Sequence, residues 1–362
     1  MRFQAGCKTT AMGIMPHKDV GKALELALGL DIPFWPQLPN LSFHEDMYAQ
    51  TAQGFPGIVV DLEGERVDFH HGRFEGELGL YSEKMGDPGY FALSADHAAV
   101  HHKFLERDLS GYVAIRGQVT GPISFGFRVV DESRRPIIYD EDVRTILFDF
   151  IQRKANAQYR QLRERNENAF VWIDEPGLGW VFSGLSGYDD VRAKRDYHHF
   201  LDGLDGPRAL HLCANVNLPY LLELGIDILS FDAYQIEVMP EGYASSVAQF
   251  LKGGGIISWG IVPTDSVNLG KETAGTLARL LGGYWDAVSK HAGLTPRQIA
   301  EQALIAPARC CLKNIGQVGA ADEARGQRAE DSQIPSIEER LVETAFARLK
   351  ELGQALKDRF GL

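Results

Sequence analysis

Three side chains that can bind a metal ion lie close together in the chain. His211 and Cys213 end one apolar run, and Asp232 ends the next. Imidazole, thiolate and carboxylate are ligands that zinc prefers, and three protein ligands with an open fourth position are typical of a catalytic zinc site. Cys310 or Cys311, in the later sequence ARCCLKN, is a candidate to complete the set. These residue types predict a metal centre that takes part in chemistry.

The use of cysteine supports this interpretation. The chain has 362 residues and only four cysteines, two of them adjacent. This pattern is typical of a reducing compartment, where cysteine more often binds metal or catalyses than forms cross-links. The N-terminal residues do not resemble a signal peptide, and no run of about eighteen apolar residues predicts a membrane span. We therefore expect a cytoplasmic protein.

The net charge of the chain indicates which classes of partner it can bind. A formal net charge of -12 argues against binding to nucleic acid or to an anionic membrane surface, since both attract basic proteins. We expect the partners to be small molecules or another protein.

The elements that must position these residues follow from the apolar pattern. Short runs typical of strands alternate with segments of helical period. The strand-like runs are residues 9–15, 57–62, 112–119, 169–174, 208–213, 227–232, 255–262 and 303–307. The clearest helix is predicted over residues 141–163, with Asp140 as its N-cap. Eight alternations of strand and helix predict an α/β fold, a (β/α)8 TIM barrel.

The barrel predicts where the chemistry lies. In this fold the active site is built at the C-terminal ends of the strands. His211, Cys213 and Asp232 follow strand ends, Asp174 and Glu175 end the run VWIDEP, and Cys310 follows the last run. Residues far apart in the sequence are therefore expected to converge at one mouth of the barrel.

Several short motifs resemble one family. The chain is similar to the catalytic barrel of cobalamin-independent methionine synthase, within the superfamily of uroporphyrinogen decarboxylase and the methylcobalamin:coenzyme M methyltransferases. The family's TT-x-x-G-x-x-P pattern is matched by Thr9, Thr10, Gly13 and Pro16. Residues 173–176 read IDEP, as in its substrate strand. Residues 115–126, IRGQVTGPISFG, look equally close to the coenzyme M methyltransferases.

The resemblance implies a set of site residues and a cofactor. Zinc would be held by His211, Cys213, Asp232 and Cys310. The substrate would be bound by Met12, Gly13, Ile14, Gln118, Asp174 and Glu175, where Asp174 matches the IDEP aspartate that the family uses. The implied reaction is transfer of a methyl group to a zinc-bound thiolate, with homocysteine as the acceptor and methionine as the product.

Four departures from the family pattern bear on the substrates. Asp232 stands where the family usually has glutamate, and Ile14 replaces a serine that helps to hold homocysteine. The histidine expected as proton donor has no counterpart in the sequence SWGIVPTDS. The chain also has no room for the second barrel that helps methionine synthases to bind methylfolate. A methylcorrinoid donor, either free methylcobalamin or a methylated corrinoid protein, is therefore favoured slightly over methylfolate.

Two alternatives remain open. The acceptor could be coenzyme M or another small thiol, which Ile14 would allow. A different class would be a uroporphyrinogen decarboxylase-like lyase, or a non-catalytic barrel that binds a corrinoid or porphyrin. The lyase would need arginines near the first strand for the substrate carboxylates, and AMGIMPHKDVGK contains none.

The last part of the chain is predicted to lie outside the catalytic barrel. Residues 1–315 are assigned to the barrel, and residues 316–362 to a polar linker and a C-terminal helix. The helix is expected to cover the barrel or a partner subunit, and the second case would give a homodimer.

Overall fold

The computed structural model describes residues 3–183, 187–213, 217–311 and 334–362. Its centre is a curled sheet of seven parallel strands in the order β1-β9-β8-β7-β6-β5-β4. The strands are β1 (Lys8–Thr9), β4 (Ile115–Thr120), β5 (Ala169–Asp174), β6 (Arg208–Leu212), β7 (Ile228–Asp232), β8 (Ile256–Val262) and β9 (Ala303–Pro307). Seven of the eight predicted runs therefore contribute to this sheet, although the first contributes only its beginning.

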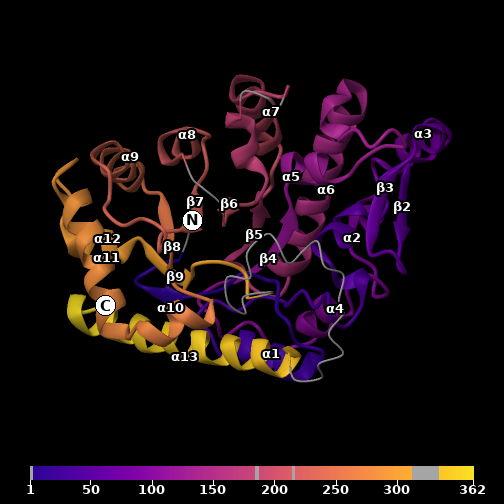
Figure 1. Ribbon diagram of the computed structural model, residues 1–362. Helices are drawn as coiled ribbons and strands as arrows, with labels where there is room; N and C mark the ends of the chain where they lie inside the picture. The colour runs from indigo at the N-terminus through magenta and orange to yellow at the C-terminus, as the bar shows by residue number, and fades with distance from the viewer. Residues whose placement is uncertain (1–2, 184–186, 214–216, 312–333) are drawn as a thin grey trace.

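Helices surround the sheet (Figure 1). They are α1 (Val20–Leu28), α2 (Met47–Ala52), α3 (His71–Lys84), α4 (Ala99–Leu105), α5 (Pro122–Arg128), α6 (Glu141–Arg163), α7 (Asp190–Asp202), α8 (Leu218–Leu222), α9 (Glu241–Lys252), α10 (Ser266–Lys271), α11 (Ala274–Ser289), α12 (Pro296–Glu301) and α13 (Ile334–Phe360). Short 3-10 turns lie at Phe43–Glu45, Pro88–Phe91, Ile137–Tyr139 and Leu178–Phe182. The predicted helix over 141–163 is confirmed as α6, and Asp140 accepts hydrogen bonds from the amides of Asp142 and Val143 at 3.1 Å.

Residues 32–34 join the two edges of the sheet. The amide of Ile32 donates to the carbonyl of Thr9 beside β1, and the amide of Arg116 on β4 donates to the carbonyl of Pro33, both at 3.0 Å. Phe34 forms a parallel bridge with Arg116. This short segment takes the place of the second strand and closes the (β/α)8 barrel that the sequence predicts.

The interior of the barrel is filled at the N-terminal ends of the strands. One buried apolar cluster draws residues from each strand or the residues just before it: Ala5, Ile32, Ala114, Phe170, Trp172, Ala209, Ile228, Ile256 and Leu304. Because this end is packed, the opposite rim is where a substrate can enter, as in other barrels of this kind.

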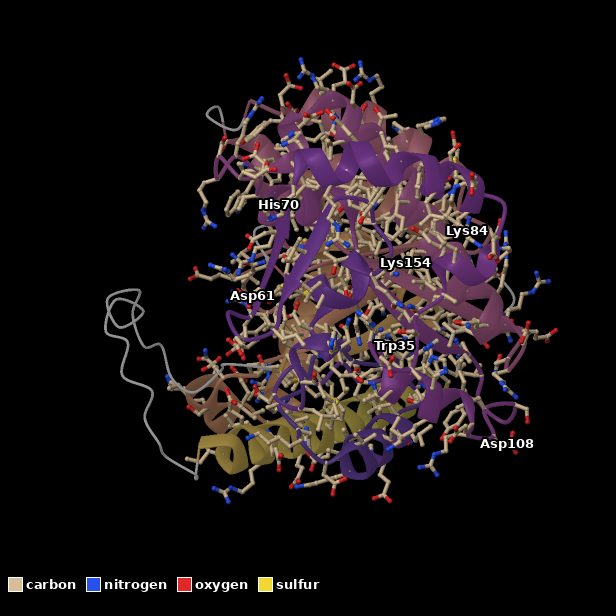
Figure 2. All side chains as sticks on the ribbon, turned by 90° about the vertical axis from the view of Figure 1, so that its right-hand side faces the viewer. Trp35, Asp61, His70, Lys84, Asp108 and Lys154 are labelled. Carbon is tan, nitrogen blue, oxygen red and sulfur yellow. The ribbon has the colours of Figure 1, made fainter. Side chains whose placement is uncertain are left out.

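The predicted strand at 57–62 is wrong as a barrel strand. Residues Ile58–Asp61 form β2, which pairs antiparallel with β3 (Arg66–Phe69) in a separate two-stranded sheet. The hairpin lies at the side of the molecule, with α3 beside it (Figure 1). Figure 2 shows the hairpin between the labelled residues Asp61 and His70. Three of the four β2 residues are half-buried, which suits a peripheral hairpin better than a barrel strand enclosed on both faces.

Helix α13 packs on the barrel itself. It contacts β9, β1 and α11, and in Figure 1 it runs along the lower side of the barrel next to α1. The apolar residues of its buried face are Val342, Ala345, Phe346, Leu349, Leu352 and Leu356. Lys357 Nζ also lies 3.0 Å from Asp31 Oδ2, and the same carboxylate oxygen accepts from the amide of Thr9 at 2.8 Å. Helix α13 thus occupies the place of the helix that follows the last strand of a barrel. The predicted linker lies outside the described residues.

In the part of the chain that the structure describes, no helix combines the length and the apolar character needed to cross a membrane.

Candidate functional site

The candidate residues lie at one rim of the barrel. Asp174 ends β5 and is paired in register with His211 on β6, which in turn pairs with Ser230 on β7. Asp232 ends β7, and Cys310 follows the end of β9. Because all these strands are parallel, their C-terminal ends meet at the same edge. The convergence at one barrel mouth that the sequence predicts is therefore present in the backbone.

His211 is held in a neutral, oriented state. Its side chain is only 5% exposed, and burial, with the charge of Arg116 adding to it, lowers its pKa to about 3. Its Nδ1 lies 3.1 Å from the hydroxyl oxygen of Ser230. In the tautomer in which Nδ1–H donates to Ser230, Nε2 carries a lone pair. This is the form in which a histidine binds a metal ion, and a partner on the other ring nitrogen is the usual support for such a ligand.

Two thiols lie at the same rim. Burial, with smaller contributions from the nearby Cys310 and Asp174, raises the pKa of Cys213 to about 12, and the charge of Arg309 opposes this shift. Cys213 and Cys310 are both half-buried, whereas Cys311 is 7% exposed and belongs to the hydrophobic core. Cys311 therefore packs as a core residue. The Cys213 thiol, with a pKa of about 12, is protonated at neutral pH unless a cation stabilises its thiolate.

Asp232 already has a cationic partner. Arg309 Nε lies 2.7 Å from Asp232 Oδ2, and the aspartate is 2% exposed. The amide of Gln235 donates to the other carboxylate oxygen at 3.2 Å. Arg309 also interacts electrostatically with Cys213 and Cys310. A guanidinium therefore lies beside three of the four groups that the resemblance assigns to zinc.

The described residues do not form a complete metal centre. Among them, no group of three or more His, Cys, Asp or Glu side chains is arranged to hold a metal ion. The donor chemistry nevertheless suits zinc, since a neutral imidazole and two thiols lie at the same rim of the barrel, after β6 and β9. Binding through Asp232 as well would require Arg309 to move away.

Asp174 is a partly exposed acidic group at the rim of the barrel. It is half-buried, and its carboxylate makes no hydrogen bond to another described residue. Burial raises its pKa to about 7; the guanidinium of Arg116 opposes this shift and the charge of Glu175 adds to it. A partly exposed carboxylate at the rim can receive an ammonium group, which is the role that the resemblance implies for Asp174.

Glu175 has a different place. Its carboxylate accepts hydrogen bonds from the amides of Ile123 at 3.1 Å and Ser124 at 2.7 Å, and from the Ser124 hydroxyl. These amides open helix α5, whose N-terminus favours a negative charge. The side chain is fully buried, and burial raises its pKa to about 7. Glu175 thus fixes α5 beside the rim.

The predicted residues of the first strand lie next to Gln118. Gly13 approaches so closely that an added Cβ would lie 2.5 Å from Gln118 Cδ. The Gln118 amide donates to the carbonyl of Trp35 at 2.9 Å and accepts from Arg116 Nη1 at 3.0 Å. Met12 and Ile14, on either side of the glycine, are half-buried. Gln118 therefore supports the wall of the barrel, and a side chain at position 13 would displace its amide.

Sequence reasoning missed Arg116. The side chain is fully buried, and its Nε donates to Thr10 Oγ1 at 3.1 Å. Its Nη2 has no hydrogen-bond partner among the described residues. Burial lowers its pKa to about 9, and Asp174 opposes that shift. A charged residue in the otherwise uncharged strand IRGQVT was the available signal. Arg309, also missed, was marked only by its position before Cys310.

Comparison with known proteins supports the fold. No family model matches the sequence, and no curated protein is detectably similar to it. A solved methyltransferase from Methanosarcina mazei is similar in structure, with a TM-score of 0.56 and 14% sequence identity over 100% of this chain and 95% of that chain. The two proteins share a fold along their whole length, and that fold is the barrel expected from the resemblance.

A second solved structure is a B12-independent methionine synthase from Shewanella sp. W3-18-1 in complex with selenomethionine. The match has a TM-score of 0.42 and 15% identity, and it covers 69% of this chain. This chain spans 64% of the length of that methionine synthase.

Proposed function

We propose that the protein is a zinc-dependent methyltransferase that methylates a small thiol, with homocysteine as the first candidate acceptor and methionine as its product. The methyl donor would be a methylcorrinoid or a methylfolate. The observation that carries the proposal is the grouping of a neutral His211 with the thiols of Cys213 and Cys310 at the mouth of the barrel. One imidazole and two thiols suit a bound zinc ion that activates a thiol substrate. They suit acid-base catalysis of hydrolysis less well.

Zinc would be held by His211, Cys213 and Cys310, with Asp232 joining if Arg309 releases it. Bound there, it would lower the pKa of an incoming thiol so that the substrate is a thiolate at neutral pH. The two protein thiolates would keep the site electron-rich, which favours attack on a methyl carbon.

The remaining residues bind and orient. Ser230 holds Nδ1 of His211, so that Nε2 faces away from it. Asp174 would receive the ammonium group of an amino acid thiol, and the nearby charge of Arg116 favours its ionised form. Glu175 fixes the start of α5 beside Asp174. Packing at the N-terminal end of the strands excludes water from below the site.

Coenzyme M or another small thiol is the second candidate acceptor. The observation that favours it is the half-buried Ile14, which offers no hydroxyl to a substrate carboxylate. An acceptor without an ammonium group would also not need Asp174. The two acceptors are therefore distinguished by whether turnover depends on that residue.

The first test is metal content, measured by elemental analysis on protein purified without added metal. We expect about one zinc per chain in the wild type, lost in His211→Ala, Cys213→Ser and Cys310→Ser. Cys311→Ser is the matched control, because Cys311 lies in the core. A wild type that neither contains nor takes up zinc would overturn the proposal and favour the lyase or a non-catalytic binding barrel.

Activity is the second test. Homocysteine and coenzyme M are each combined with methylcobalamin and with methyltetrahydrofolate, and formation of the thioether is followed by mass spectrometry. Product from one of these four pairs, dependent on Cys213, supports the proposal. A zinc-loaded enzyme that methylates neither thiol with either donor contradicts it.

A further inference from the structure

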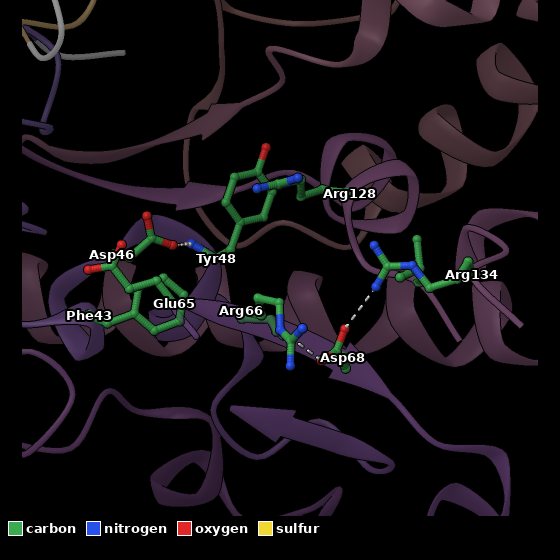
Figure 3. Close-up of a pocket in the computed structure, with 10 residues that line it drawn as sticks. Phe43, Asp46, Tyr48, Glu65, Arg66, Asp68, Arg128 and Arg134 are labelled. Carbon is green, nitrogen blue, oxygen red and sulfur yellow. Dashed lines mark hydrogen bonds and ion pairs between the residues drawn. The ribbon is translucent and has the colours of Figure 1, made fainter. Parts of the chain in front are cut away.

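A pocket outside the proposed thiol site lies between the end of α5 and the long insertion that joins residues 32–34 to β4. Its volume is about 230 Å³. Figure 3 shows that it is lined from one side by the Phe43–Glu45 turn and α2, and from below by the β2-β3 hairpin. The end of α5 and the turn that follows it form the remaining side. The barrel does not need this insertion to close, so the pocket has no evident structural purpose.

The acidic residues of the pocket are largely engaged. Asp68 lies 3.6 Å from Arg66 Nε and 3.9 Å from Arg134 Nη1. Asp46 caps α2, since its carboxylate accepts from the amides of Tyr48 at 2.8 Å and Ala49 at 3.3 Å. Glu65 lies beside Phe43, across the pocket from Arg128 (Figure 3). The side of the pocket formed by α5 and its following turn carries Arg128 and Arg134, and the charge of Arg128 also acts on Asp46.

Arg128 has a guanidinium that can donate hydrogen bonds to a ligand. It is exposed at the end of α5, and among the described residues it makes no ion pair. Its guanidinium carbon lies 6.0 Å from the centre of the Tyr48 ring, which orients it over the pocket (Figure 3). Arg134 is 73% exposed and holds Asp68 only at long range. A guanidinium presents a planar fork of N–H donors that matches a carboxylate or a phosphate.

The pocket adjoins the candidate site. Helix α5 begins at the amides bound by Glu175 and ends at Arg128. Seven helical residues span about 10 Å. Tyr48, which lines the pocket, interacts electrostatically with both Glu175 and Cys213. A ligand that reaches the thiol site from the mouth can therefore place a second group in this pocket.

We propose that this pocket binds an anionic group of the methyl donor, with Arg128 as the main contact and Arg134 as the second. The inference rests on the proposed methyl transfer. Pockets that enclose a whole small molecule usually measure about 300 to 1,000 Å³, so this one takes a single group of a larger donor. The group is the phosphodiester of a methylcorrinoid or a glutamate carboxylate of a methylfolate, and both share the chemistry that a guanidinium recognises.

The test is equilibrium binding of methylcobalamin and of methyltetrahydrofolate, each measured by calorimetry on the full-length, zinc-loaded protein. We expect one donor to bind the wild type, and Arg128→Gln to weaken that binding about tenfold. Arg134→Gln should weaken it less, and pyrophosphate should compete with the donor. Arg73→Gln is the matched control, because Arg73 is an exposed arginine that pairs with Glu77 outside the pocket. In turnover, Arg128→Gln should raise the KM for the donor and leave kcat unchanged.

The outcomes separate the pocket from the proposed function. Weakened binding of methylcobalamin alone identifies the phosphodiester as the occupant, and weakened binding of methyltetrahydrofolate alone identifies the carboxylate. Wild-type affinity for both donors in Arg128→Gln and Arg134→Gln, with thiol methylation intact, overturns the pocket inference and leaves the function standing. A wild type that binds neither donor and methylates no thiol overturns both.

Discussion

Arg309 and Asp232 form an ion pair at the mouth of the barrel, with 2.7 Å between Nε and Oδ2. The carboxylate is buried and the guanidinium is 55% exposed. The pair therefore places a partly exposed positive charge where the family resemblance expects a metal ion. Because the same guanidinium interacts with Cys213 and Cys310, it competes electrostatically with any divalent cation that these thiols would bind.

Removal of this charge should strengthen zinc binding. In Arg309→Gln, Asp232 loses its partner and the thiols lose a neighbouring cation. We expect zinc affinity to rise about tenfold, a modest effect because Arg309 is more than half exposed and screened by solvent. Arg309→Lys should stay close to the wild type. Competition with a chromophoric chelator at fixed pH measures the change. The control is Arg297→Gln, which breaks a surface ion pair with Glu301. Weaker zinc binding in Arg309→Gln would mean that Arg309 supports the zinc ligands and does not compete with the metal ion.

Ser230 should matter for metal binding through His211. Ser230→Ala removes the partner of Nδ1 and lets the imidazole rotate or change tautomer. Loss of such support typically lowers metal affinity by 10- to 100-fold, and we expect a decrease in that range with little change in folding. Ser258→Ala is a matched control, since Ser258 pairs with Ser230 in register on β8 and its hydroxyl has no partner among the described residues. Equal affinities in the two variants would show that His211 needs no support from Ser230.

The sequence predicted the barrel because its strands are enclosed on both faces and therefore read as apolar runs. The same rule misassigned residues 57–62, whose run IVV belongs to a hairpin. It also missed residues 32–34, where the chain has only a short bridge that includes Pro33, a residue without an amide donor. The bridge of residues 32–34 depends on Arg116, far along the chain, so nearby residues could not reveal it. Residues 58–61 pair locally with β3, and their apolar run did not show that this hairpin lies outside the barrel.

The candidate site was predictable in type but not in detail. His211, Cys213 and Asp232 were marked by their chemistry and by the ends of apolar runs. The ion pair of Asp232 with Arg309 was not, because it joins residues 77 positions apart. The resemblance favoured Asp174 over Glu175, but the sequence did not show that the Glu175 carboxylate is turned to the amides of α5. Which of two adjacent acids faces a substrate depends on the strand's alternation and on its neighbours.

Substrate binding should depend on pH through Asp174. Burial raises its pKa to about 7, so the carboxylate is ionised above that pH and becomes neutral below it. If Asp174 binds an ammonium group, the KM for homocysteine should rise about tenfold for each pH unit below 7. Asp174→Asn should have a high KM at every pH and lose this dependence. Coenzyme M, which has no ammonium group, serves as the control substrate. The same acidic limb with coenzyme M would assign the titration to another group.

The docking of α13 on the first strand can be tested with two helical glycines. A Cβ added at Gly353 would lie 2.8 Å from Thr9 Cγ2, whereas one added at Gly283 in α11 would meet nothing within 4 Å. Gly353→Ala should lower the free energy of unfolding by about 1 to 3 kcal/mol, because the helix must shift away from β1. Gly283→Ala should raise it by about 0.5 to 1 kcal/mol through helix propensity alone. Urea unfolding followed by circular dichroism measures both changes. Stabilisation by both substitutions would contradict the close packing of α13 on β1 and would favour a helix held loosely against the barrel.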